Sequence, residues 1–333
     1  MDEILNIMRA LADPTRLRIA LLIRQLELSV GEVVQILGQS QPRVSRHIRI
    51  LDEAGIAKRR KEGSWVFLRP GSILTGGTLD ALFNGQNAED NRAVLRDMSK
   101  LEQVRAARAE MAASYFAQHA GEWDELRSLH IAECEVENAM QSILCAAPLG
   151  AVLDIGTGTG RMIELFSKDA TRFTAIDNNT EMLRVARAKL TGAGIADSRV
   201  EIMLGDFNAL PIGDAQYDTI FLHQVLHYAQ GPERVIAEAA RVLAPSGRMV
   251  IVDFAPHDRE ELRTVHAHTR LGFSDDSIAF AFSACGLHMA HQATLDGGAL
   301  TVKIWMGQKE ALPVNAKPII SKLQNDTKLR IVS

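Results

Sequence analysis

A glycine-rich segment in the middle of the chain has residue types suited to holding a charged ligand. It reads VLDIGTGTG and runs from Val152 to Gly160. The apolar residues predict a buried strand, and Gly156, Gly158 and Gly160 allow the following turn to approach a ligand while helix N–H groups face negative charge. A glycine turn alone is a weak indication of a nucleotide site, so the segments that follow decide its meaning.

Two carboxylates follow at the ends of the next predicted strands. Asp177 ends FTAID, 21 positions after Gly156, where it can accept hydrogen bonds from both ribose hydroxyls. Asp206 lies in LGDFNALP, where it can accept from an adenine amine while the backbone beside Phe207 addresses the ring. The glycine turn and Asp177 fit NAD as well as S-adenosylmethionine (SAM), and a structural turn followed by a capping Asp is the alternative.

The elements that must position these residues alternate along the second half of the chain. Helical stretches separate five predicted strands, VLDI, FTAID, VEIML, YDTIFL and RMVIVDF. This alternation is typical of a parallel, doubly wound α/β sheet of the Rossmann-like type.

The series of motifs resembles the class I SAM-dependent methyltransferases over roughly residues 120–307, most closely the branch that acts on small molecules. The resemblance implies SAM or S-adenosylhomocysteine (SAH) as cofactor, with Asp154 and Gly156 at its amino-acid end, Asp177 at the ribose, and Asp206 with Phe207 at the adenine. The sequence departs from the family at PSG (245–247), where Pro-Gly-Gly is common. The complete predicted cofactor set is Asp154, Gly156, Gly158, Gly160, Asp177, Asn178, Asp206, Phe207 and His223.

Methyl transfer requires an in-line nucleophile, exclusion of water and loss of a proton. His223 would lie near the methyl group, and His223 and His227 are the candidate catalytic bases, although two histidines four residues apart can also simply hydrogen-bond locally. His257 and Asp253 are further candidates. A lid is predicted from Tyr115, Trp123, Asp124, Arg127 and His130.

The first part of the chain carries a different set of functional residues. Residues 1–75 contain 12 Lys and Arg against 8 Asp and Glu, a net charge of +4, whereas the whole chain has −4. Residues 4–25 predict two helices broken at Asp13-Pro14, and two more helices follow at 29–38 and 41–53, the second capped by Ser40. Residues 56–70 predict a β-hairpin, so the order is that of a helix-turn-helix with a wing.

If Val44, Ile48 and Leu51 face the core, the opposite side of helix 41–53 presents guanidinium and amide groups suited to phosphate contact and base reading. These residues and the hairpin resemble the ArsR/SmtB family of winged-helix repressors over residues 4–70. The resemblance implies a symmetric dimer on double-stranded operator DNA. The predicted DNA contacts are Ser40, Gln41, Arg43, Ser45, Arg46 and His47 in the recognition helix, with Arg59 and Arg60 in the wing.

The family's usual metal sensor is missing from the sequence. Ser29 and Gly31 stand where many members have a Cys-x-Cys pair, and soft metals need thiolates. The histidine pairs His266/His268 and His288/His291 have metal-like spacing without an accompanying carboxylate or cysteine set. We therefore expect no metal site.

The predicted fold is multidomain, an N-terminal winged helix-turn-helix (α+β) followed by a C-terminal Rossmann-like doubly wound sheet. The expected boundaries are 1–75 for the winged helix, 76–118 for a linker and connecting helix, 119–310 for the methyltransferase domain and 311–333 for a tail. No apolar run approaches 18 residues and the N-terminus lacks a signal-peptide pattern, so we expect a cytoplasmic protein without membrane contact.

Three functions are compatible with this sequence. The first is a repressor fused to an active methyltransferase with an unknown small-molecule acceptor. The second is a non-catalytic repressor that senses SAM or SAH and regulates methionine-cycle genes. The third, a methyltransferase with a front domain used only for dimerisation, agrees poorly with the intact recognition helix. We expect the first, in a homodimer.

Overall fold

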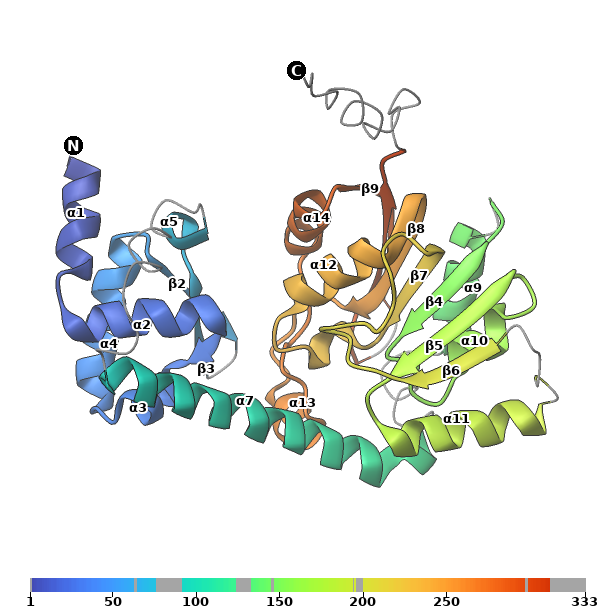
Figure 1. The fold of residues 1–333 in the computed structure, drawn as a ribbon, viewed down its shortest axis with the longest axis horizontal. Coiled ribbons are helices and arrows are strands. Elements are labelled where there is room, and N and C mark those ends of the chain that lie inside the picture. Colours follow the sequence, from blue (N-terminus) through green and yellow to red (C-terminus); the bar gives the residue numbers. More distant parts are fainter. Residues whose placement is uncertain are drawn as a thin grey trace, which may run out of the picture.

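The structure is a computed structural model of the 333-residue chain, and two domains joined by a long helix are visible in it (Figure 1). The residues that it describes are 2–62, 65–75, 92–123, 133–144, 147–193, 195, 200–296 and 299–311. The predicted tail beyond residue 311 and the lid residues Asp124, Arg127 and His130 lie outside this part of the chain.

The first domain is a helical unit closed by a small antiparallel sheet in the order β1-β3-β2. Its elements are α1 (Asp2–Leu11), α2 (Pro14–Gln25), β1 (Leu28–Ser29), α3 (Val30–Leu37), α4 (Gln41–Glu53), β2 (Ala57–Glu62), β3 (Trp65–Pro70) and α5 (Ser72–Thr75). This is the predicted winged helix-turn-helix.

Local chemistry sets the ends of these helices. The Asp13 side chain accepts hydrogen bonds from the Thr15 and Arg16 N–H groups, with Pro14 in the first turn, which confirms the predicted break between α1 and α2. Ser29 and Glu32 form a capping box at the start of α3. Ser29 thus has a structural role as the N-cap of α3.

The second domain is built on a seven-stranded sheet in the order β6-β5-β4-β7-β8-β10-β9. All pairings among the first five of these strands are parallel, and β10 is antiparallel to β8 and β9. The strands are β4 (Ala151–Ile155), β5 (Arg172–Asp177), β6 (Val200–Leu204), β7 (Tyr217–His223), β8 (Leu243–Phe254), β9 (Leu287–Leu295) and β10 (Val302–Lys309).

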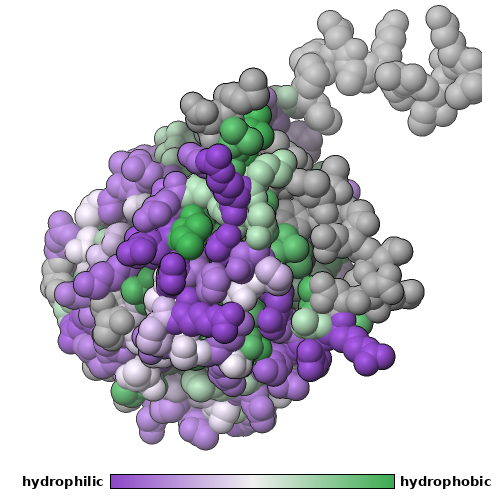
Figure 2. Space-filling model, turned by 90° about the vertical axis from the view of Figure 1, so that its left-hand side faces the viewer, coloured by the Kyte–Doolittle hydropathy of each residue, from purple (hydrophilic) through white to green (hydrophobic). Residues whose placement is uncertain are grey.

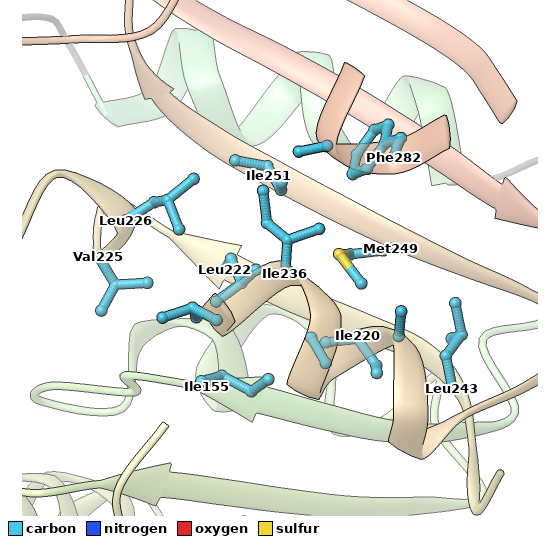
Figure 3. Close-up of a cluster of buried hydrophobic side chains, with 14 of the residues drawn as sticks. Ile155, Ile220, Leu222, Val225, Leu226, Ile236, Leu243, Met249, Ile251 and Phe282 are labelled. Carbon is cyan, nitrogen blue, oxygen red and sulfur yellow. The ribbon is translucent and has the colours of Figure 1, made fainter. Parts of the chain in front are cut away.

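Helices cover both faces of this sheet. They are α9 (Glu133–Leu144), α10 (Arg161–Phe166), α11 (Thr180–Gly192), α12 (Pro232–Val242), α13 (Glu260–Val265) and α14 (Asp275–Ala284), with a 3₁₀ turn η3 (Leu226–Tyr228). On one face Ile236 and Phe282 pack with Ile220 and Met249 (Figure 3). Phe221 points to the other face, where it stacks with Phe166. Alternate residues of β7 therefore serve two cores, as expected for a sheet buried on both sides.

A single helix, α7 (Arg92–His119), runs along the underside of both domains in Figure 1 and is followed by the short turn η2 (Ala120–Glu122). Leu101 and Val104 are buried in the core of the winged helix. Further along, the Ala113 carbonyl accepts a hydrogen bond from the Asn179 amide of the second domain at 3.1 Å. The helix thus belongs to both packing units.

The domains also contact each other directly through Glu27, which follows α2. Its side chain is 8% exposed and forms ion pairs with Arg60 of β2 and Arg270 of the second domain. The guanidinium of Arg263 lies 4.7 Å from the centre of the Phe67 ring on β3. One face of the hairpin is therefore turned towards the second domain.

Among the described helices none is long and apolar enough to cross a membrane.

Candidate functional site: a cavity shared by two domains

A cavity of about 1040 Å³ lies at the carboxyl ends of β4, β5 and β7 and extends to the winged helix. The chain leaves β4 for β5 and β6 on one side, and later adds β7 and β8 on the other. In open α/β sheets such a reversal of strand order leaves a crevice where ligands bind. The fold therefore places the glycine turn at a ligand-binding position.

Gly156 is required by both conformation and space. Its φ is +74°, and a Cβ there would come within 2.3 Å of a Val225 methyl group. The N–H groups of Gly156 and Thr157 donate to the Ile176 carbonyl, which ties the turn to the end of β5. Only a glycine allows the backbone to pass so close to the segment after β7.

Asp177 joins the glycine turn to the end of β5. Its carboxylate accepts hydrogen bonds from the Gly158 N–H and the Asn179 N–H, each at 2.8 Å. Burial raises the pKa of Asp177, while these backbone hydrogen bonds act in the opposite direction. Asp177 therefore fixes the loop and also faces the cavity.

Asp206 and Phe207 lie after β6 on the same cavity. One oxygen of the Asp206 carboxylate accepts from the backbone N–H and the side-chain amide of Asn208, at 2.9 and 2.8 Å. Asp206 is exposed and Phe207 is half-buried. This short Asx turn positions a carboxylate and an aromatic ring together.

Eight of the nine residues predicted to hold the cofactor line this one cavity: Asp154, Gly156, Gly158, Asp177, Asn178, Asp206, Phe207 and His223. Gly160 does not line it. With φ of +87°, Gly160 is the N-cap residue just before α10, and its position next to Ala186 serves the packing of α10 against α11. Turns, carboxylates and a ring in this order fit an adenosyl group with an amino-acid chain.

The two candidate bases have different surroundings. His223 is half-buried at the end of β7 and lines the cavity. His227 is 2% exposed, does not line it, and its Nδ1 lies 2.8 Å from the Asp253 carboxylate, which is fully buried. His227 and Asp253 therefore form a pair beneath the cavity wall, and their geometry is that of a structural support.

Aromatic rings form one wall of the cavity. Phe116, Trp123 and Tyr228 pack edge to face or tilted, with ring centres 4.7 to 6.2 Å apart, and all three line the cavity. Trp123 also lies beside Gly158, since a Cβ there would be 3.4 Å from its Nε1. Of the predicted lid, Tyr115 lies just behind this wall, with its hydroxyl 2.7 Å from His266 Nδ1.

Sequence reasoning missed Gln224, Tyr228 and Gln230, which also line the cavity. Gln224 has φ of +51°, a conformation that is uncommon outside glycine and that often occurs at functional sites. Nothing in the sequence signals it, because the strained backbone follows from the tertiary contacts of the strand end. Tyr228 lies within the segment YDTIFLHQVLHYAQ, but no feature of that segment indicated that this tyrosine lines a cavity.

The predicted recognition helix presents a polar surface. Ser40, Gln41, Arg43, Ser45 and Arg46 are exposed, whereas Val44, Ile48 and Leu51 are buried as predicted. His47 is half-buried, 3.7 Å from Asp13, and burial lowers its pKa.

The two predicted wing contacts face in different directions. Arg59 is exposed and pairs with Asp52 of α4 at 2.8 Å. Arg60 points to the opposite face of the hairpin, where it pairs with Glu27 against the second domain. The structure therefore separates Arg60 from the other predicted DNA contacts.

The histidine pairs remain apart from any ligand set. His288 and His291 are on β9, at the sheet edge, and His268 lies next to His227 with the two rings tilted and their centres 4.1 Å apart. Within the described part of the chain, no group of three or more His, Cys, Asp or Glu side chains is arranged to hold a metal ion.

Fold and site together define a protein in which a winged helix precedes a Rossmann-like domain with a nucleoside pocket. Residues 153–251 match a model described as a methyltransferase domain, and residues 13–59 match that of the bacterial regulatory proteins of the arsR family.

Curated proteins match parts of this chain. A phosphatidylethanolamine N-methyltransferase of Cereibacter sphaeroides is 34% identical over 157 residues, which cover 45% of this chain and 76% of that protein. A ubiquinone/menaquinone biosynthesis C-methyltransferase of Shewanella halifaxensis is 32% identical over 36% of this chain and 49% of its own length. An uncharacterized 37.1 kDa protein in a transposon of Streptomyces fradiae is 32% identical over 40% of each chain.

Among solved structures, a methyltransferase in complex with the Trm112 activator of Haloferax volcanii matches with a TM-score of 0.49 at 20% identity, over 59% of this chain and 97% of that one. The chain spans less than half of the first two curated relatives that it matches. It belongs to the SAM-dependent methyltransferases, with an arsR-family regulatory domain at its front. Membership confirms SAM or SAH as the cofactor of the second domain.

Proposed function

We propose that the protein is a DNA-binding regulator whose second domain transfers a methyl group from SAM to a small-molecule acceptor. The observation that carries the proposal is the cavity of about 1040 Å³, which is lined by eight of the nine predicted cofactor residues and continues beyond them. Ligand sites usually measure about 300–1,000 Å³. A cavity of this size provides space for a second molecule beside a nucleoside cofactor.

When bound, SAM supplies a methyl group already activated by its positive sulfur. The protein then has to orient the reactants and exclude water. Asp177 and Asp206 provide acceptors for the nucleoside, while Phe116, Trp123 and Tyr228 form a wall that restricts water. His223 is the proposed base because it lines the cavity, and His227 is the proposed support of that wall.

The relatives are named for methylation of nitrogen in one case and of carbon in the other, so their names favour no single chemistry.

The test of this function measures SAH binding by calorimetry and then transfer of labelled methyl from SAM to small molecules of a cell extract. We expect SAH to bind and a labelled small molecule to appear. Asp177→Ala should weaken SAH binding by about 1–3 kcal/mol, the cost of hydrogen bonds to a charged group. Binding of SAH without any labelled product would support the non-catalytic sensor instead, and absence of SAH binding would contradict both.

DNA binding is the second half of the proposal. The exposed Gln41, Arg43, Ser45 and Arg46 of α4 support it, because phosphates and base edges are contacted by such groups. Arg46→Ala should weaken operator binding and leave SAH affinity unchanged. Arg184→Ala is the matched control, since Arg184 is exposed on α11 and pairs only with Glu181 among the contacts described. If Arg46→Ala weakened SAH binding as much as operator binding, the assignment of DNA binding and cofactor binding to separate domains would be contradicted.

A homodimer is the proposed assembly. Helix α1 exposes Ile4, Leu5 and Met8, of which Ile4 is 61% exposed, and hydrophobic side chains interrupt the largely polar surface of this end (Figure 2). Such side chains on one short helix favour burial against a second copy.

A further inference from the structure

Where the cavity extends to the winged helix, its lining includes several basic side chains from both domains. The winged helix and α7 contribute Arg24, Lys58, Arg69, Arg105 and Arg108, and the second domain contributes Arg234 and Arg270. The acidic residues lining the same part are Glu27, Glu233 and Asp276. Cations therefore exceed anions here, in contrast to the cofactor end with Asp154, Asp177 and Asp206.

Several of these cations already have partners. Arg270 pairs with Glu27, and Arg108 holds Glu32 through two hydrogen bonds of 2.8 and 2.5 Å. Arg105 pairs with Glu102 at 2.9 Å. In contrast, Lys58, Arg69 and Arg234 form no side-chain hydrogen bond or ion pair with any residue that the structure describes. Their charges remain available to a ligand.

The hairpin register explains why two of these cations face the cavity. Lys58 and Arg69 lie directly opposite each other on β2 and β3. Arg60 and Phe67 are also opposite each other, two residues further along, and their side chains lie on the same face of the hairpin. Since Arg60 contacts Glu27 and Phe67 lies under Arg263, this face is turned to the second domain. Alternation of side chains along a strand places Lys58 and Arg69 on that face too.

Arg234 approaches from the other domain. It lies in the first turn of α12, next to Gly231 and one turn after Gln230, whose amide donates to the Arg105 carbonyl at 3.2 Å. This hydrogen bond keeps the start of α12 against α7. The three cations thus belong to one cavity but to separate elements of two domains.

We propose that Lys58, Arg69 and Arg234 form an anion-binding subsite for the acceptor, which is therefore a small organic anion carrying a carboxylate, phosphate or sulfate group. This inference rests on the proposed function, because it identifies the class of molecule that shares the cavity with SAM. The nucleophilic end of the acceptor faces His223 and the cofactor, and its anionic end contacts both domains. Arg69 is half-buried, whereas Lys58 and Arg234 are exposed, so the three charges attract an anion jointly and salt should screen this attraction.

The experiment uses the full chain saturated with SAH and two probes that differ in one group, 1-naphthyl phosphate and 1-naphthol. Fluorescence titration should give at least tenfold tighter binding of the phosphate, and this difference should shrink as salt is raised. Inorganic phosphate should compete with it. Equal affinity for both probes, or no binding of the phosphate, would overturn the proposal.

Arg69→Gln and Arg234→Gln should each weaken 1-naphthyl phosphate binding several-fold, the double variant at least tenfold, with 1-naphthol unaffected. Arg184→Gln, an exposed arginine outside the cavity, is the matched control. SAH affinity and thermal unfolding report that each variant is folded. If SAH binds while the variants keep full affinity for the phosphate, the subsite is wrong and the proposed function stands; if SAH does not bind, the proposed function fails first.

Arg69→Gln also separates the subsite from a role in DNA contact. The subsite predicts unchanged operator affinity in the absence of the probe. A loss of operator affinity together with unchanged probe binding would assign Arg69 to DNA and contradict the proposal.

Discussion

At the scale of single residues, Gly156 shows how closely the cofactor loop is packed. Gly156→Ala should lower the free energy of unfolding, because positive φ costs an L-residue about 1–2 kcal/mol and overpacking against Val225 adds about 1–3 kcal/mol. Chemical denaturation measures this loss, and SAH affinity should fall with it. Gly192→Ala is the control, since a Cβ there meets nothing within 4 Å. Equal stability of the two variants would contradict the packing argument.

Asp177 gives a prediction in pH. Its pKa in the folded protein lies above 3.8, the ordinary value, so protonation begins at a higher pH than for an exposed Asp. A protonated carboxyl loses an acceptor for the ribose hydroxyls that Asp177 is proposed to bind, so SAH affinity should decrease on acidification while the protein is still folded. The contribution of Asp177 to the free energy of unfolding changes in the opposite direction. Because its pKa is higher in the folded state, this group favours folding at pH values below that pKa and disfavours folding at pH values above it.

Titration of SAH binding in the wild type and in Asp177→Asn checks this prediction. The variant should bind more weakly at neutral pH and show a flatter dependence on pH. An identical pH profile in both proteins would assign the dependence to another group.

The residues that the sequence predicted were those with a distinctive type at a distinctive place. Asp177 and Asp206 could be predicted because each ends a recognisable apolar strand, and strand ends meet at one edge of a parallel sheet. Gln224 could not be predicted, because its positive φ depends on contacts made only after folding. His227 and His223 were equivalent in sequence, and only burial next to Asp253 distinguishes them.

At the scale of elements, Glu27 is the contact that joins the wing to the second domain. Glu27→Gln should destabilise the protein by about 3–5 kcal/mol, because it removes the buried carboxylate that pairs with the guanidiniums of both Arg60 and Arg270. Glu102→Gln is a suitable control, since Glu102 is 63% exposed and surface pairs contribute about 0–1 kcal/mol. Urea unfolding followed by fluorescence measures both. Similar midpoints would show that this contact does not hold the domains.

Element positions were largely predictable, and so was the buried face of α4, but the orientation of the hairpin was not. The break at Asp13-Pro14, the helix from 41 to 53 and the five parallel strands follow from caps and periodicity, which are local signals. The hairpin was predicted correctly as well, but Arg60 was expected to face DNA. Its direction is set by Glu27 and Arg270, which are distant in sequence, and no local pattern carries that information.

At the scale of the whole molecule, the exposed side chains of α1 predict self-association. Met8→Lys should shift the protein from dimer to monomer in light scattering and weaken operator binding, since a dimer contacts two half-sites. Leu95→Lys is the comparison, because Leu95 is 48% exposed but belongs to α7. A wild type that is monomeric at micromolar concentration would contradict the proposed assembly.

The shared helix α7 also has a consequence for the spacing of the two domains. Because an α-helix turns about 100° and rises about 1.5 Å per residue, one residue inserted between Val104 and Ala113 would rotate one domain around the other by over a quarter of a circle. Glu27 would then no longer meet Arg270, and the wing would leave the nucleoside pocket without its far wall. The number of residues in this helix therefore fixes how the winged helix and the second domain together enclose the cavity.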